Sequence, residues 1–177
     1  MEERMNRQEA LDQLEILSAE AAEKMDETGC KYLTFSVDEE YYGIKIEFVR
    51  EIIGIQQITH VPNQLEYIEG VINLRGKIIP TIDIRKRFGK ELREYDDRTC
   101  IVVVNIDDLA VGVIVDRVVE VLNLKDDQIS LPPQGHNDIK AKYTEGIGRE
   151  DGKVIVLLDC EKIIRPEDFD GLLKSVD

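Results

Sequence analysis

The chain has 177 residues, enough for one domain or for two small domains that share a core. An apolar fraction of 42% is somewhat below the globular average but far above that of the disordered class. The formal net charge of −14, from 23 basic and 37 acidic residues, disfavours nucleic acid and anionic membrane surfaces as partners, because both attract positive charge.

Residues 1–29 are predicted to form a charged helical extension. Apolar residues recur at intervals of three and four from Leu11 to Met25, which is the spacing of one helix face, and Thr28-Gly29 ends the pattern. This helix could dock on the body of the protein, remain loosely attached, or pair with a second copy to form a dimer. The sequence leaves these three possibilities open.

No apolar stretch approaches the roughly 20 residues that a membrane-spanning helix needs, and the charged N-terminus lacks the apolar core of a signal peptide. The three cysteines are too scattered for a disulfide framework, which favours a reducing compartment. The sequence therefore predicts a soluble, cytoplasmic protein without direct membrane insertion.

From residue 30 the apolar period changes to two, which indicates β-strands. Residues 32–46 predict a first β-hairpin, and residues 71–84 predict a second one that turns at Arg75-Gly76. Between the two hairpins, residues 64–69 predict a short helix closed by Gly70.

This order of elements occurs twice. The stretch Tyr67–Asp83 is matched 76 positions later by Tyr143–Asp159, residue type for residue type at seven positions. An earlier stretch repeats at an offset of 69, so that Gly43 corresponds to Gly112. A longer loop at 131–137 in the second copy accounts for the difference between the offsets. Two β-rich copies strongly limit the possible folds, and differences between them show what the fold does not require.

The predicted fold class is mainly β, with two five-stranded β-barrels on a shared core, short helices and helical segments at the termini. Small hairpin units close into barrels because closure removes exposed strand edges. The first barrel subdomain is assigned to residues 30–95 and the second to residues 96–165. A C-terminal helix is predicted for residues 166–177, since Pro166 suits a first helical position.

No catalytic residue, metal site or cofactor is predicted. His60 and His136 have no cysteine, aspartate or glutamate at metal-ligand spacing, and adjacent aspartates fall in turns or connectors. The interpretation that competes with a binding module is a small-barrel enzyme or ligand-binding protein that uses the groove between the barrels. Such a protein needs a convergent polar pocket with perturbed titratable groups.

The turn residue Arg75 differs between the copies, because Asp151 takes its place in the second. The fold therefore does not require a guanidinium there. An arginine with five fixed donors suits recognition of carboxylates or carbonyls on a partner, although a solvated arginine fits equally well. Asp83 and Asp159, by contrast, match, which favours a structural role as acceptors of backbone N–H bonds.

Three stretches, Val49–Ile52, Ile68–Arg85 and Val111–Val118, resemble the CheW family of bacterial chemotaxis coupling proteins. The resemblance covers about residues 31–164. It implies a fold of two SH3-like five-stranded β-barrels packed around a shared core, and a function without catalysis. Since the chain has no room for a kinase or receiver domain, the resemblance favours a stand-alone coupling protein.

Members of this family join the cytoplasmic tips of chemoreceptors to the regulatory domain of the histidine kinase CheA, in membrane-associated receptor arrays. The resemblance implies a receptor-binding surface made by Val49, Glu51, Gly70, Arg75, Val118 and Val121. It implies kinase-binding positions at Ile58, Val61, Ile129 and Gln134. The loop after Ile129 departs from the family, which often has an aromatic residue where this chain has Pro132–Gly135.

Overall fold

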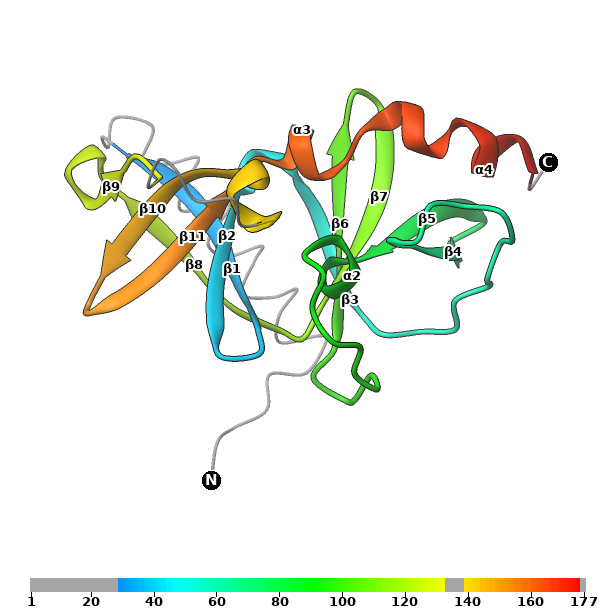
Figure 1. The fold of residues 1–177 in the computed structure, drawn as a ribbon, viewed down its shortest axis with the longest axis horizontal. Coiled ribbons are helices and arrows are strands. Elements are labelled where there is room, and N and C mark those ends of the chain that lie inside the picture. The colour runs from blue at the N-terminus through cyan, green and yellow to red at the C-terminus, as the bar shows by residue number, and fades with distance from the viewer. Residues whose placement is uncertain (1–28, 133–138, 176–177) are drawn as a thin grey trace.

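The computed structural model describes residues 29–132 and 139–175, and these residues form two β-sheets that lie side by side (Figure 1). The six-stranded sheet has the order β8-β1-β2-β11-β10-β9, with β1 (Cys30–Val37), β2 (Glu40–Lys45), β8 (Arg117–Leu124), β9 (Ile129–Ser130), β10 (Thr144–Glu150) and β11 (Lys153–Leu158). The five-stranded sheet has the order β3-β6-β7-β5-β4, with β3 (Val49–Gly54), β4 (Ile68–Leu74), β5 (Lys77–Asp83), β6 (Cys100–Ile106) and β7 (Leu109–Val115).

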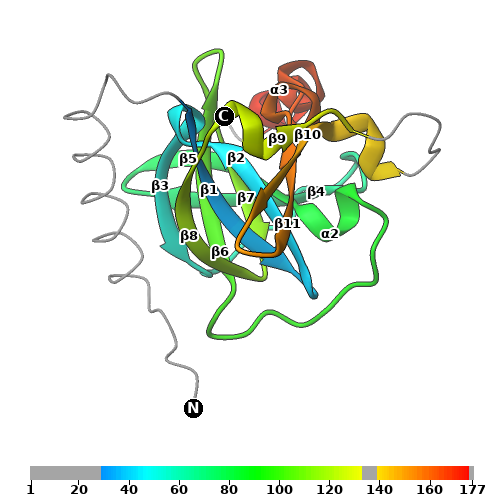
Figure 2. The ribbon, with the colours of Figure 1, turned by 90° about the vertical axis from the view of Figure 1, so that its left-hand side faces the viewer.

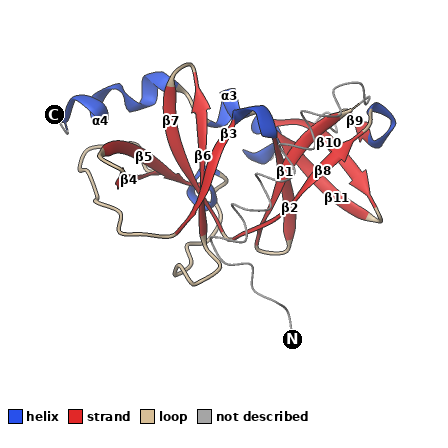
Figure 3. Cartoon of the chain, turned by 180° about the vertical axis from the view of Figure 1, so that it is seen from behind, coloured by secondary structure: helices blue, strands red, loops and turns tan. Residues whose placement is uncertain are grey.

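The helical segments are short; some connect strands, and the last three follow the final strand, β11 (Figure 3). The α-helices are α2 (Ile84–Arg87), α3 (Cys160–Ile163) and α4 (Asp170–Ser175). The 3₁₀ turns are η1 (Ile46–Phe48), η2 (Asp126–Gln128), η3 (Ile139–Tyr143) and η4 (Pro166–Phe169). Pro166 opens the C-terminal helical segment, as predicted. Within the described ranges, no helix has the length and apolar character needed to cross a membrane.

The two sequence repeats exchange their first hairpins. The β1–β2 hairpin of the first repeat pairs with β8 and β11 of the second, and the β6–β7 hairpin of the second pairs with β3 and β5 of the first. The parallel pairs Gly43–Leu157 and Gly112–Thr81 are equivalent under the offsets of 69 and 76 seen in the sequence. The predicted ranges 30–95 and 96–165 therefore mark the repeats, and each sheet takes strands from both of them.

The core consists of a large cluster between the sheets and a smaller cluster inside each sheet. The β6 strand shows how the sequence builds both, because alternate side chains of a strand point to opposite faces. Val102 and Val104 join the cluster shared by the two sheets, whereas Ile101 and Val103 join the cluster inside the five-stranded sheet. The large cluster contains residues of both sheets, which confirms the predicted shared core. Figure 2 shows the six-stranded sheet in front of the five-stranded sheet.

Turns and caps also follow the repeat. Arg75-Gly76 and Asp151-Gly152 both have positive φ at each residue, which is the geometry of a two-residue type I′ hairpin and explains why glycine persists in both copies. The Asp83 carboxylate accepts a hydrogen bond from the Arg85 amide at 2.8 Å, and Asp159 accepts the equivalent bond from Glu161 at 3.0 Å. The predicted structural role of the two aspartates is confirmed.

One expectation needs revision, and another is confirmed only in its coarser form. The predicted helix at 64–69 is a single turn, in which the Ile68 amide donates to the Leu65 carbonyl at 3.0 Å, and β4 begins at Ile68. The Asp83 amide donates to the Tyr67 carbonyl, so pairing with β5 draws this end of the segment into the sheet. For the described residues, strand pairing leaves β3 and β4 as edges of one sheet and β8 and β9 as edges of the other, so the mainly β fold is confirmed without showing a closed barrel.

A buried arginine connects the sheets at their junction. The Arg85 side chain is only 5% exposed and donates to Asp116, from Nε at 2.9 Å and from Nη2 at 2.5 Å. It also donates to Asp38, in the β1–β2 turn, and to the Glu91 carbonyl. Asp116 in turn accepts the Asp38 amide at 2.8 Å. The network thus ties the turn of one sheet to the end of β7 in the other.

Replacing Asp116 with asparagine is expected to remove part of the acid sensitivity of the fold. Burial opposes ionisation of Asp116, but hydrogen bonds from Arg85 and from the Asp38 amide outweigh it and lower its pKa. The stabilisation from a lowered pKa is complete above the unfolded value of about 3.9 and is lost as pH falls through the folded value. Urea unfolding between pH 7 and pH 2.5 should show a shallower acid loss in Asp116→Asn, from a lower starting stability. An identical slope in both proteins would contradict this.

Candidate functional site

Glu51 on β3 and Arg75 in the β4–β5 turn form an ion pair. Arg75 Nη2 lies 2.5 Å from Glu51 Oε1, and the hydrogen bond to Glu51 raises the pKa of Arg75. The Arg75 side chain is 70% exposed while that of Glu51 is 18% exposed. The carboxylate therefore orients one edge of the guanidinium and leaves its other donors toward solvent. Two residues predicted separately for one surface are in direct contact.

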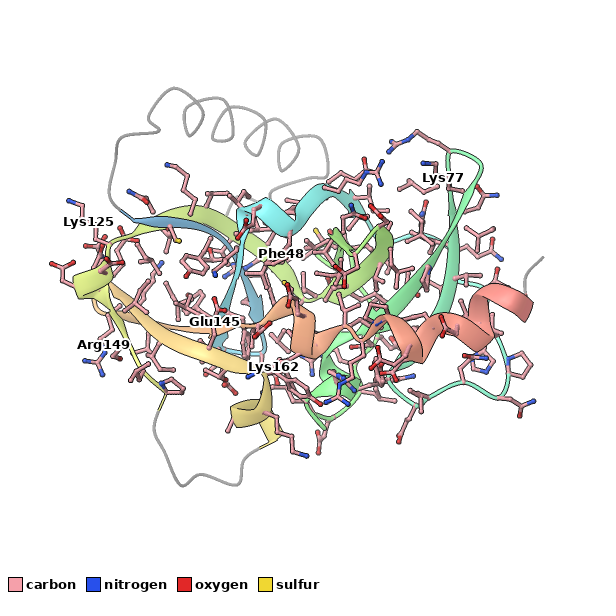
Figure 4. The ribbon with its side chains drawn as sticks, turned by 90° about the horizontal axis from the view of Figure 1, so that it is seen from above. Phe48, Lys77, Lys125, Glu145, Arg149 and Lys162 are labelled. Atoms are coloured by element: carbon pink, nitrogen blue, oxygen red, sulfur yellow. The ribbon has the colours of Figure 1, made fainter. Side chains whose placement is uncertain are left out.

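The pair lies at a recess in the five-stranded sheet. The recess measures about 290 Å³ and is lined by the pair together with Arg50, Leu74, Lys77, Ile79, Val103 and Ala110. Ile78, on the same hairpin, is an exposed apolar side chain, and Lys77 is labelled beside the hairpin tip in Figure 4. The site thus combines a held cation with exposed apolar surface, the composition typical of interaction hot spots.

A β-bulge separates Val49 from Glu51. Val49 pairs with Val104 but Glu51 pairs with Val103, so the two residues face opposite sides of β3. Val49 packs at the edge of the core cluster shared by the sheets, beside η1, whose Phe48 lies between the two sheets in Figure 4. Val49 and Glu51, both predicted to bind the receptor, therefore lie on opposite faces of β3. A strictly alternating strand would place residues two apart on the same face.

The other two predicted valines, Val118 and Val121, lie on β8 of the six-stranded sheet. Val121 is partly buried against the shared cluster, and Val118 is buried with 7% exposure. Gly70 is also buried, and a Cβ at this position would lie 2.2 Å from the Thr59 carbonyl oxygen. Its φ of 155° belongs to a region that L-residues avoid. Gly70 thus shapes the backbone under the hairpin and offers no side chain to a partner.

The predicted kinase-binding residues lie in separate places. Ile58 is partly buried against the cluster inside the five-stranded sheet, and Val61 is partly buried against the shared cluster. Ile129, on β9, packs on the cluster inside the six-stranded sheet, and Gln134 lies outside the described residues. The structure brings Glu51 and Arg75 together, whereas these four positions stay a prediction.

Residues 29–132 and 139–175 contain no cluster of metal ligands. No group of three or more histidine, cysteine, aspartate or glutamate side chains in these ranges could hold a metal ion. The features that stand out are a two-sheet β-scaffold, an exposed arginine held by a carboxylate, and an apolar seam between the sheets. The seam consists of partly buried residues at the edge of the shared cluster, such as Val49 and Val121. These features define a protein-interaction module of the adaptor type.

Comparison with known proteins gives the family. The model of the CheW-like domain matches residues 31–168, so the chain belongs to the CheW-like family. The chemotaxis protein CheW of Klebsiella aerogenes is 37% identical over 83% of this chain and 90% of its own length. CheW of Thermotoga maritima is 36% identical over 75% and 85%. The crystal structure of the scaffolding protein TtCheW from Thermoanaerobacter tengcongensis superposes with a TM-score of 0.73 at 37% identity, covering 80% of this chain and 96% of that one.

Family membership, supported by sequence and by fold, defines the protein as a chemotaxis coupling protein with a scaffolding role. The resemblance noted at the three sequence stretches is thereby confirmed. The matched region, residues 31–168, contains both sheets and the junction between them.

Proposed function

We propose that the protein links the cytoplasmic tips of chemoreceptors to the regulatory domain of the histidine kinase CheA, and that it has no catalytic activity of its own. We infer further that the two sheets are the SH3-like barrels of the family, that the protein works in the cytoplasm, and that receptor arrays at the membrane recruit it. The observation that carries this proposal is the exposed Arg75, which Glu51 holds at the recess in the five-stranded sheet.

The proposed receptor surface combines this ion pair with the seam between the sheets. Val49 and Val121 supply partly exposed apolar contact on its two walls, and Val118 supports the second wall from the core. Gly70 contributes through the shape of the backbone. The proposed kinase surface uses Ile58 and Val61, with a second contact at Ile129 and Gln134, as the family resemblance implies.

Exchanging Arg75 for glutamate is expected to weaken receptor binding at least tenfold while leaving the fold intact. The side chain is largely exposed, so its replacement costs little stability, but the new carboxylate repels both Glu51 and the receptor groups that Arg75 binds. The measurement is recovery of receptors and kinase from the cell's own lysate on the purified protein, identified by mass spectrometry. Receptors should be lost with Arg75→Glu, and the kinase should be retained.

Two further variants separate direct contact from internal pairing. The charge-exchanged protein Glu51→Arg/Arg75→Glu restores an ion pair but reverses the charge offered to a partner, so receptor recovery should stay low. Arg149→Glu makes the same change on an exposed arginine of the other sheet and should bind normally. Full recovery with the exchanged pair would show that Arg75 serves only Glu51. Loss of folding in Arg75→Glu would make the residue structural.

A further inference from the structure

A large pocket among the described residues is lined mainly by cations, although the whole protein is acidic. It measures about 750 Å³ and lies at the junction of the sheets, under α2 and α3. Its cationic side chains are Lys86, Arg87, Lys142, Lys162 and Arg165. Glu66 and Asp168 are its only carboxylates among the described residues, in a chain whose net charge is −14. A concentration of positive charge on an acidic protein needs a reason of its own.

The two repeats build this pocket together. Tyr67 corresponds to Tyr143 and Lys86 to Lys162 under the offset of 76, so the shared frame comes from matched residues of both copies. The remaining cations are not matched. Arg87, for example, stands where the second copy has the buried Ile163. Comparison of the two copies therefore indicates that the fold requires an arginine neither at position 75 nor at position 87.

Arg87 is held between two aromatic rings with most of its donors unused. Its guanidinium carbon lies 3.9 Å from the centre of the Tyr67 ring and 4.8 Å from that of Tyr143, so both rings contact the cation. Nη2 makes one long bond of 3.4 Å to the Lys162 carbonyl, and the buried Nε has no hydrogen-bond partner in the described structure. Buried donors are normally satisfied, so this nitrogen is a donor that a ligand could use.

The carboxylates of the pocket leave most of its cations available. Asp168 accepts a hydrogen bond from the Tyr67 hydroxyl, and burial together with that bond raises the pKa of Tyr67, which keeps the phenol a donor. Lys86 pairs with Glu69 at 2.6 Å. Among the described residues, no carboxylate lies within 4.0 Å of the charged atoms of Arg87, Lys162 or Arg165, since none of the ion pairs found there includes them.

We infer that this pocket binds a small molecule carrying a multiply charged anionic group, either phosphate or clustered carboxylates. Arginine and lysine are the residues that recognise such groups, and the volume suits a ligand of metabolite size. The overall charge of −14 repels anions at long range, but salt screens that repulsion beyond about 10 Å, so the local cluster decides binding. The inference is independent of the proposed coupling function, because the pocket and the Arg75 site share no residues.

Isothermal titration calorimetry of the full chain with inorganic pyrophosphate, and separately with citrate, tests the inference. We expect saturable binding at one site per chain, with acetate giving none. Arg87→Gln should lower the affinity at least tenfold. Arg149→Gln, the same substitution on an exposed arginine outside the pocket, should leave the affinity unchanged. Tighter binding of pyrophosphate would assign the site to phosphate-bearing ligands, and tighter binding of citrate to polycarboxylates.

Lys162→Gln keeps the test valid if Arg87→Gln fails to fold. Lys162 is exposed on α3, at the junction of the sheets in Figure 4, and its hydrogen bond with Arg87 uses its backbone carbonyl, so its side chain can be changed without removing that bond. This variant should bind several-fold more weakly. Absence of saturable binding of both anions up to 10 mM (roughly the weak limit for a charged site), or equal affinities for Lys162→Gln and Arg149→Gln, would overturn the inference. Arg75→Glu should bind pyrophosphate normally.

Discussion

Replacing Arg85 with methionine is expected to lower the free energy of unfolding by about 3–5 kcal/mol, because it leaves the largely buried Asp116 carboxylate without its buried cation. Asp116 is 14% exposed and has its main partner in Arg85, whose pKa is raised chiefly by the hydrogen bond to Asp116. Methionine has a similar length and no charge, so the loss reports on the ion pair more than on packing. Urea unfolding followed by far-ultraviolet circular dichroism measures it.

A matched substitution separates burial from mere pairing. Arg93 also contacts Asp116, at 3.3 Å, but its side chain is 46% exposed. Arg93→Met should therefore cost only about 0–1 kcal/mol, as exposed ion pairs do. The two variants together show how much each arginine contributes to the free energy of unfolding through its contact with Asp116. Similar losses in both proteins would show that Arg85 does not hold the sheets together.

Local elements could be predicted because their signals are local. Alternation of apolar residues defined the hairpins, and comparison of the copies explained Gly76 and the two capping aspartates. The partners of the hairpins could not be predicted in this way. Periodicity states which face of a strand is buried, but the exchange of β1–β2 and β6–β7 between repeats satisfies the same pattern as a repeat that closes on itself.

The candidate site could be predicted from the sequence only in part, for a similar reason. Comparison of the copies marked Arg75, but its contact with Glu51 spans 24 residues and depends on the bulge in β3, which adds one residue to the period. Arg85 was missed because it begins a charge-dense stretch that resembles a solvated connector. Its partners, Asp38 and Asp116, come from distant turns, and only the folded chain brings them together. A signal existed in that both aspartates directly follow buried strands.

Gly70→Ala is expected to destabilise the protein by about 4 kcal/mol, combining a disallowed backbone conformation with overpacking. The new Cβ would lie 2.2 Å from the Thr59 carbonyl oxygen, and that oxygen accepts the Val71 amide at 2.9 Å. Relief of the clash must break this bridge between the 55–67 segment and β4. The measurement is urea unfolding, together with hydrogen exchange at the Thr59 and Val71 amides.

Gly76→Ala is the matched control, since Gly76 also has positive φ but nothing lies within 4 Å of its added Cβ. It should cost only about 1 kcal/mol, the penalty of a left-handed residue alone. A stable Gly70→Ala protein that still fails to bind receptors would make Gly70 a direct contact. The expected outcome, lost stability, would instead support the proposal that buried Gly70 and Val118 maintain the shape of the receptor surface, whereas the exposed Arg75 contacts the partner directly.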